Sequence, residues 1–119
     1  MIEGLWVIKL LTPDDPSMDL NGGVVVIETD RIFGGDSGYF YIGSLRPAEQ
    51  NTWSVAVQIT RHDPNIESIF GDTDKIELTG TIHKAGKDQQ DRSLIKLKMR
   101  DNATAIDMTA LMTKVADLP

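Results

Sequence analysis

Hydrophobic side chains recur at every second position over most of the chain, which is the period of a half-buried β-strand. In the segment Trp53 to Thr60, one face would carry Trp53, Val55, Val57 and Ile59. The segments Ile76 to His83 and Ile95 to Arg100 alternate in the same way. Each segment therefore predicts a strand with one apolar face and one polar face.

Five further segments complete the predicted set of eight strands: Leu5 to Leu11, Val24 to Glu28, Arg31 to Phe33, Tyr39 to Leu45, and Thr104 to Met112. The last segment has two interpretations. Its alternating apolar positions favour a strand, whereas Ala, Met and Leu are helix formers and Asp101-Asn102 could cap a helix; we favour the strand. One short helical turn is expected from Asp63 to Gly71, with Asp63 as the cap and Pro64 at the first helical position.

Eight strands at a spacing of about ten residues, separated by turns, are typical of an all-β sandwich or barrel. The 119 residues suit one core, so we expect a single domain over residues 1–119. A closed antiparallel barrel is favoured because closure removes exposed sheet edges. The side chains expected inside it are Trp6, Tyr41, Val55, Val57, Leu78, Ile82, Ile95 and Leu97.

Two glycine motifs suggest a particular kind of barrel. Gly4-Leu5-Trp6 has the G-x-W form found at the head of the first strand in lipocalin-like and avidin-like barrels, although a strand-start glycine before a core Trp gives the same three residues. Gly34 to Leu45 combines a Gly-Gly-Asp turn with a Tyr-x-Gly-x-Leu strand. We expect Gly35 or Gly38 to take a positive φ in that turn and Asp36 to accept hydrogen bonds from its amides.

The second motif, with the glycine-led strand at Gly22-Gly23-Val24 and the alternating strands that follow, resembles the GrlR-type negative regulators of type III secretion. This resemblance covers most of the chain. It implies an eight-stranded lipocalin-like (calycin-like) barrel, a homodimer, and a function in sequestering a helix-turn-helix transcription activator. The chain departs from that family in one place, because the family's acidic Glu-Asp-Glu-Asp loop corresponds here to Arg46-Pro47-Ala48-Glu49-Gln50.

The net charge and the composition limit the classes of partner and the cellular location that we expect. The formal net charge of −6 opposes a phosphate backbone, so we expect no direct nucleic-acid binding and instead a basic protein partner. The longest apolar stretches are four residues, which excludes a membrane-spanning segment, and Met1-Ile2-Glu3 lacks the basic start of a secretory signal. With no Cys as well, a reducing compartment and a cytoplasmic location are expected.

Candidate catalytic and metal motifs fail at positions that the chemistry requires. Asp72 to Glu77 begins like a calcium loop but has Glu77 where the loop needs Gly. His62 and His83 do not have a zinc spacing, and no serine sits in a G-x-S-x-G elbow. We therefore expect no enzyme activity, no metal and no cofactor.

Two functions are favoured, and an enzyme of a type that these motifs do not reveal is kept as a third alternative. A protein-binding regulator would offer acidic loop residues to its partner, namely Asp14, Asp15, Glu49, Asp72 and Asp74. A small-molecule binding barrel would hold a hydrophobic ligand inside, against Trp6, Tyr39, Tyr41, Gly43 and Trp53. Small residues at Gly43, Ala56 and Gly80 would leave room for it.

Two surface features bear on assembly. The strands Leu5 to Leu11 and Val24 to Ile27 carry apolar groups on both faces, so one copy of the barrel would leave some of them exposed, and we expect a homodimer. Lys96, Lys98 and Arg100 form a basic stripe that could meet an anionic partner, or could simply be a solvated strand face.

Overall fold

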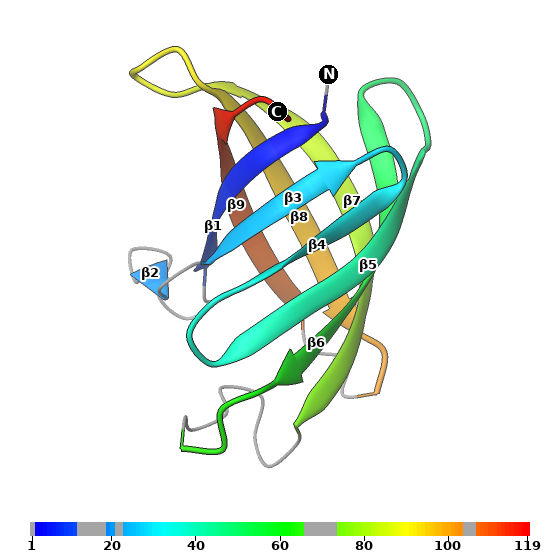
Figure 1. Cartoon of the computed structure of the whole chain (residues 1–119). Helices are drawn as coiled ribbons and strands as arrows, with labels where there is room; N and C mark the ends of the chain where they lie inside the picture. Colours follow the sequence, from blue (N-terminus) through cyan, green and yellow to red (C-terminus); the bar gives the residue numbers. More distant parts are fainter. Residues whose placement is uncertain (1, 12–18, 21–22, 66–73, 104–106) are drawn as a thin grey trace.

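A computed structural model describes residues 2–11, 19–20, 23–65, 74–103 and 107–119. These residues form a closed antiparallel barrel of eight strands (Figure 1). The strands are β1 (Gly4–Leu11), β3 (Val24–Glu28), β4 (Arg31–Gly35), β5 (Tyr39–Pro47), β6 (Thr52–Arg61), β7 (Lys75–Lys87), β8 (Ser93–Asp101) and β9 (Asp107–Ala116). A further two-residue strand, β2 (Asp19–Leu20), pairs with the end of β1.

Pairing between β1 and β9 closes the barrel. From β3 to β9 each strand pairs with the next one along the chain, and β1 pairs with β3 on one side and β9 on the other. We call the end where β1 begins and β9 ends the upper end, as in Figure 1, and the opposite end, where β5 and β7 begin, the lower end.

The predicted strands are confirmed, including the last. β9 is a strand, although Thr104 to Ile106 at the start of the predicted segment lie outside the described residues. Several strands run further than their patterns indicate: β4 continues to Gly35, β5 to Pro47, β7 to Lys87 and β9 to Ala116. These extensions contain few apolar residues, and the β7–β8 register shifts between Lys84 and Lys87, so alternation could not reveal them.

The barrel interior is the hydrophobic core. All eight residues predicted inside are buried, with Trp6, Leu78 and Ile82 exposing 1% of their surface or less. They share the core with the other buried apolar side chains: Ile8, Val25, Ile27, Ile32, Tyr39, Leu45, Ile59, Ile76, Met99, Ala110 and Met112. Core residues thus come from all eight barrel strands, as inward-facing positions of a closed sheet should.

The turn between β4 and β5 differs from the prediction, because neither Gly35 nor Gly38 takes a positive φ. The Asp36 amide donates to the Tyr39 carbonyl at 2.9 Å, and Asp36 Oδ1 accepts from the amides of Gly38 and Tyr39, each at 2.8 Å. This side chain stabilises the turn with ordinary dihedrals. Gly35 is needed for a close approach instead, since a Cβ there would lie 2.7 Å from the Tyr39 carbonyl oxygen.

The part of the chain that the structure describes contains no helix, and so none that could cross a membrane. The predicted helical turn begins with a turn at Pro64 and Asn65, where the Asn65 amide donates to Asp63 Oδ1 at 2.9 Å. The rest of that segment, 66–71, lies outside the described residues.

Replacing Leu97 with Ala should test the inward face. Leu97 is 2% exposed and lies opposite both Ile82 and Ala110. Loss of its buried methyl groups should lower the free energy of unfolding by ~2–5 kcal/mol. Lys98→Ala, at the adjacent exposed position, should change it by less than about 0.5 kcal/mol. Urea unfolding measures both, and equal midpoints for Leu97→Ala and wild type would contradict the assignment of Leu97 to the core.

Candidate functional site

Among the described residues, the core side chains at the barrel centre line only a small cavity. The cavity there has a volume of about 20 Å³ and is lined by core side chains including Tyr41, Val57, Leu97 and Met99. That is room for about one water molecule, whereas small-molecule sites span roughly 300–1,000 Å³. This cavity among the core side chains is thus too small for a drug-sized ligand.

The small residues predicted to leave room do not do so. Gly43 faces inward, but a Cβ there would lie 2.2 Å from the Ala56 carbonyl oxygen, and one at Gly80 would lie 1.9 Å from the Lys98 carbonyl oxygen. The backbone of a neighbouring strand takes up this space, so both glycines permit close strand approach. Ala56 is exposed on the outer face.

The five predicted ligand-binding residues separate into two groups. Trp6 and Trp53 lie at the upper end, near the starts of β1 and β6. Tyr39 and Tyr41 lie at the lower end in β5, and Gly43 lies further along the same strand. The two tryptophans line a larger cavity formed by described residues.

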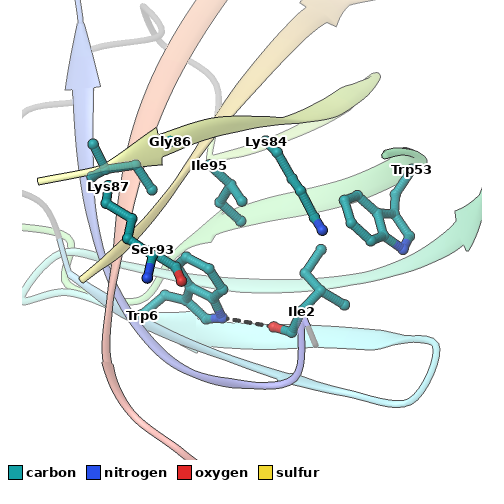
Figure 2. A pocket seen from close by; sticks show the side chains of 9 residues that line it. Ile2, Trp6, Trp53, Lys84, Gly86, Lys87, Ser93 and Ile95 are labelled. Atoms are coloured by element: carbon teal, nitrogen blue, oxygen red, sulfur yellow. Dashed lines mark hydrogen bonds between the residues drawn. The ribbon is translucent and has the colours of Figure 1, made fainter. Parts of the chain in front are cut away.

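This cavity, the upper pocket, has a volume of about 290 Å³ (Figure 2). Its lining comes from the chain start and from the upper ends of β1, β6, β7 and β8: Ile2, Trp6, Trp53, Lys84, Gly86, Lys87, Ser93, Leu94 and Ile95. Figure 2 shows the Lys84 side chain reaching towards the space between Ile2 and Trp53. The pocket joins apolar walls to two cationic side chains.

Strand register explains how these residues meet. Trp53 lies opposite Ile82, and Lys84 lies opposite Ile95. Side chains alternate between the two faces of a strand, so Lys84, two residues after Ile82, occupies an inward position. It lies beyond the last core residue of β7, which places its ammonium at the upper end of the barrel. The Trp6 indole N–H donates to the Ile2 carbonyl at 2.9 Å, which fixes the chain start against the tryptophan.

The turn beside the upper pocket is held by Asp88. Its Oδ1 accepts from the amides of Gln90 and Arg92 at 2.9 and 2.8 Å, and its Oδ2 accepts from Arg92 Nε at 2.8 Å. These hydrogen bonds, the Arg92 amide first, lower the pKa of Asp88. The turn thereby positions the rim residues Lys87 and Ser93 on either side of it.

A second polar cluster lies at the lower end. Tyr41 O–H donates to Asp36 Oδ2, while the other oxygen of that carboxylate caps the β4–β5 turn. Burial, together with this hydrogen bond and the nearby negative charge, raises the pKa of Tyr41 far above its ordinary value. The His62 amide donates to the Gly38 carbonyl at 2.9 Å, and its ring stacks on Phe40 with centroids 6.4 Å apart. These contacts tie the turn to the end of β6.

Two of the predicted acidic partner residues, Glu49 and Asp74, lie in the part of the chain that the structure describes. Glu49 lies in the β5–β6 turn at the upper end, and Asp74 precedes β7 at the lower end, paired with Arg61. Asp14, Asp15 and Asp72 lie outside the described residues. The two placed acids are thus at opposite ends of the barrel.

An outer apolar patch lies on three adjacent strands. It consists of Val24 on β3, Phe33 on β4, and Phe40 and Ile42 on β5, which are 48%, 40%, 38% and 57% exposed. Phe33 lies directly opposite Ile42, and Gly35 lies between Val24 and Phe40 across the sheet. Val24 lies in a segment predicted to be apolar on both faces, whereas the exposure of Phe33, Phe40 and Ile42 was not predicted. The available signal was an apolar residue at an outward position of a strand whose inward positions are also apolar.

The predicted basic stripe faces outward on β8. Lys98 and Arg100 are exposed and Lys96 is half-buried, with Arg100 Nε 3.7 Å from Asp107 Oδ1. Among the described residues no group of three His, Cys, Asp or Glu side chains could hold a metal ion. His62 and His83 lie at the lower and upper ends respectively.

No protein-family model matches the chain, and no curated protein is significantly similar to it.

The Tyr41–Asp36 contact predicts a specific alkaline loss of stability. In the unfolded chain Tyr41 ionises near pH about 10, whereas the folded barrel keeps it neutral to higher pH. The contribution to stability is therefore complete below pH about 10 and is lost as the pH rises further. Urea midpoints measured from pH about 9 to about 11 should fall less steeply in Tyr41→Phe than in wild type. Parallel curves would show that the raised pKa is not linked to folding.

Proposed function

We propose that this protein is a protein-binding regulator that docks its partner on the outer apolar patch. The observation that carries the proposal is the exposure of Val24, Phe33, Phe40 and Ile42 on one face of β3, β4 and β5. Contiguous apolar side chains on an otherwise soluble surface are favoured when another macromolecule covers them. Aromatic residues of this kind also dominate interface energetics.

The closed sheet supports a docking mode that uses side chains. A partner cannot add a strand to β1 or β9, because these two strands pair with each other. The patch is also framed by polar groups, with the Glu28–Arg31 ion pair at its upper side and His62 stacked on Phe40 at its lower side. An apolar centre with a polar rim is the usual anatomy of a protein interface.

For the partner we propose a basic helix-turn-helix transcription activator in the cytoplasm, following the resemblance to the GrlR-type negative regulators. The net charge of −6 would speed encounter with a cationic protein. Because Glu49 and Asp74 lie at opposite ends, this attraction would come from the charge of the whole molecule. In the free protein a second copy would cover the patch, giving a homodimer.

Ile42→Asp should abolish docking without unfolding the barrel. Ile42 is 57% exposed, so the new charge stays in water in the monomer and becomes buried only at an interface. Sedimentation at micromolar concentration should give a dimer for wild type and a 13.1 kDa monomer for the variant. Purified helix-turn-helix activators of the source organism should lose DNA binding when wild type is added, and keep it with Ile42→Asp.

Ser44→Asp is the matched control, because Ser44 is exposed on the same strand and the same face, one outward position beyond Ile42. It should dimerise and inhibit like wild type. A wild-type monomer that leaves every tested activator on its DNA would sink the proposal, as would an Ile42→Asp variant that inhibits as well as wild type.

A further inference from the structure

We propose that the upper pocket binds a small amphipathic anion, a carboxylate of about ten non-hydrogen atoms in all, most of them in an apolar body. This site is distinct from the outer apolar patch and does not rest on the proposed regulatory function. The upper pocket lies at the mouth of the barrel, whereas the patch is on the outer face of β3, β4 and β5.

The size of the pocket sets the size of the ligand. Its 290 Å³ is close to the lower bound of known small-molecule sites, roughly 300 Å³, and corresponds to about ten times the volume of a water in the liquid. The barrel centre below is filled, with room for about one water. A ligand would therefore stop at the mouth, above the core.

The walls favour an apolar ligand body. Trp6, Trp53 and Ile95 all occupy inward positions at the upper ends of their strands, and Ile2 covers them from the chain start. Trp6 is 1% exposed and its N–H is already bonded to the Ile2 carbonyl, so the indole presents hydrocarbon to the pocket. An aromatic and aliphatic lining of this kind gains from covering apolar ligand surface.

The charges favour an anionic head group. Both charged residues that line the upper pocket, Lys84 and Lys87, are cationic, although the whole chain carries a net charge of −6. Lys87 Nζ lies 3.4 Å from Asp91 Oδ1 at an exposed site. Among the described residues the Lys84 ammonium has no carboxylate within ion-pair distance, and it reaches over the pocket between Ile2 and Trp53. A carboxylate there would accept charge-assisted hydrogen bonds.

The pocket itself provides the reporter for a binding experiment. The chain has two tryptophans, and both line the upper pocket. Intrinsic fluorescence should therefore change on titration with octanoate, which has ten non-hydrogen atoms. The same titration with 1-octanol and octylammonium separates the head-group contribution, and we expect octanoate to bind most tightly and octylammonium most weakly.

Lys84→Met removes the ammonium and keeps an unbranched side chain. We expect this variant to bind octanoate about tenfold more weakly, through loss of a charge-assisted hydrogen bond, and to bind 1-octanol as wild type does. Lys98→Met is the control, because Lys98 is exposed on the outer face of the neighbouring strand and should leave both affinities unchanged.

Three results would overturn the proposal. One is an unchanged fluorescence spectrum and no heat of binding with octanoate in the millimolar range. The second is equal affinity for octanoate, 1-octanol and octylammonium, which would make the pocket an unselective apolar surface. The third is an equal loss of octanoate affinity in Lys84→Met and Lys98→Met, which would assign the effect to net charge.

Discussion

The pairing of β1 with β9 is the constraint on which the molecule depends. Once the first and last strands are joined, every strand has two neighbours and each residue must face either the interior or the solvent. Trp6 illustrates the consequence. It lies opposite Val25 on one side and Lys114 on the other, and is thereby held inside with 1% of its surface exposed. Without closure, β1 and β9 would be open edges, and the shared core would lose one wall.

The same alternation that fills the core also makes the mouth. Inward positions do not stop where the apolar residues stop, so the strand that buries Leu78 and Ile82 goes on to present Lys84 at the upper end. At the lower end the inward-facing Tyr41 donates a hydrogen bond to Asp36. The described parts of the two ends thus differ: a buried phenol and a turn carboxylate meet at the lower end, and a pocket lined by two tryptophans lies at the upper end.

Periodicity predicted the strands and the core because both are properties of single segments. The inward face of Trp53 to Thr60, for example, can be read without knowledge of any other strand. Which side chains come together in a site depends on the register and stagger between neighbouring strands, and the periodicity of single segments does not reveal these. Trp53 and Tyr41 share an inward face yet lie towards opposite ends, so the expected grouping of ligand residues did not form. Gly43 and Gly80 do not leave room for a ligand for the same reason. A missing side chain creates space only where a neighbouring strand does not fill it.

Net charge and local charge act separately on this barrel. A charge of −6 raises the potential felt by any approaching ion, but salt screens it over about 10 Å at 0.1 M ionic strength. A ligand seated beside Lys84 and Lys87 is within reach of those ammonium groups at much shorter range. An anion can therefore bind at the upper end of an acidic protein. The outer apolar patch would bind a partner differently, through burial of apolar surface, and salt screening does not weaken that contribution. The two surfaces can be distinguished by this physics: added salt weakens an interaction at the mouth and spares the cohesion of an interface on β3, β4 and β5.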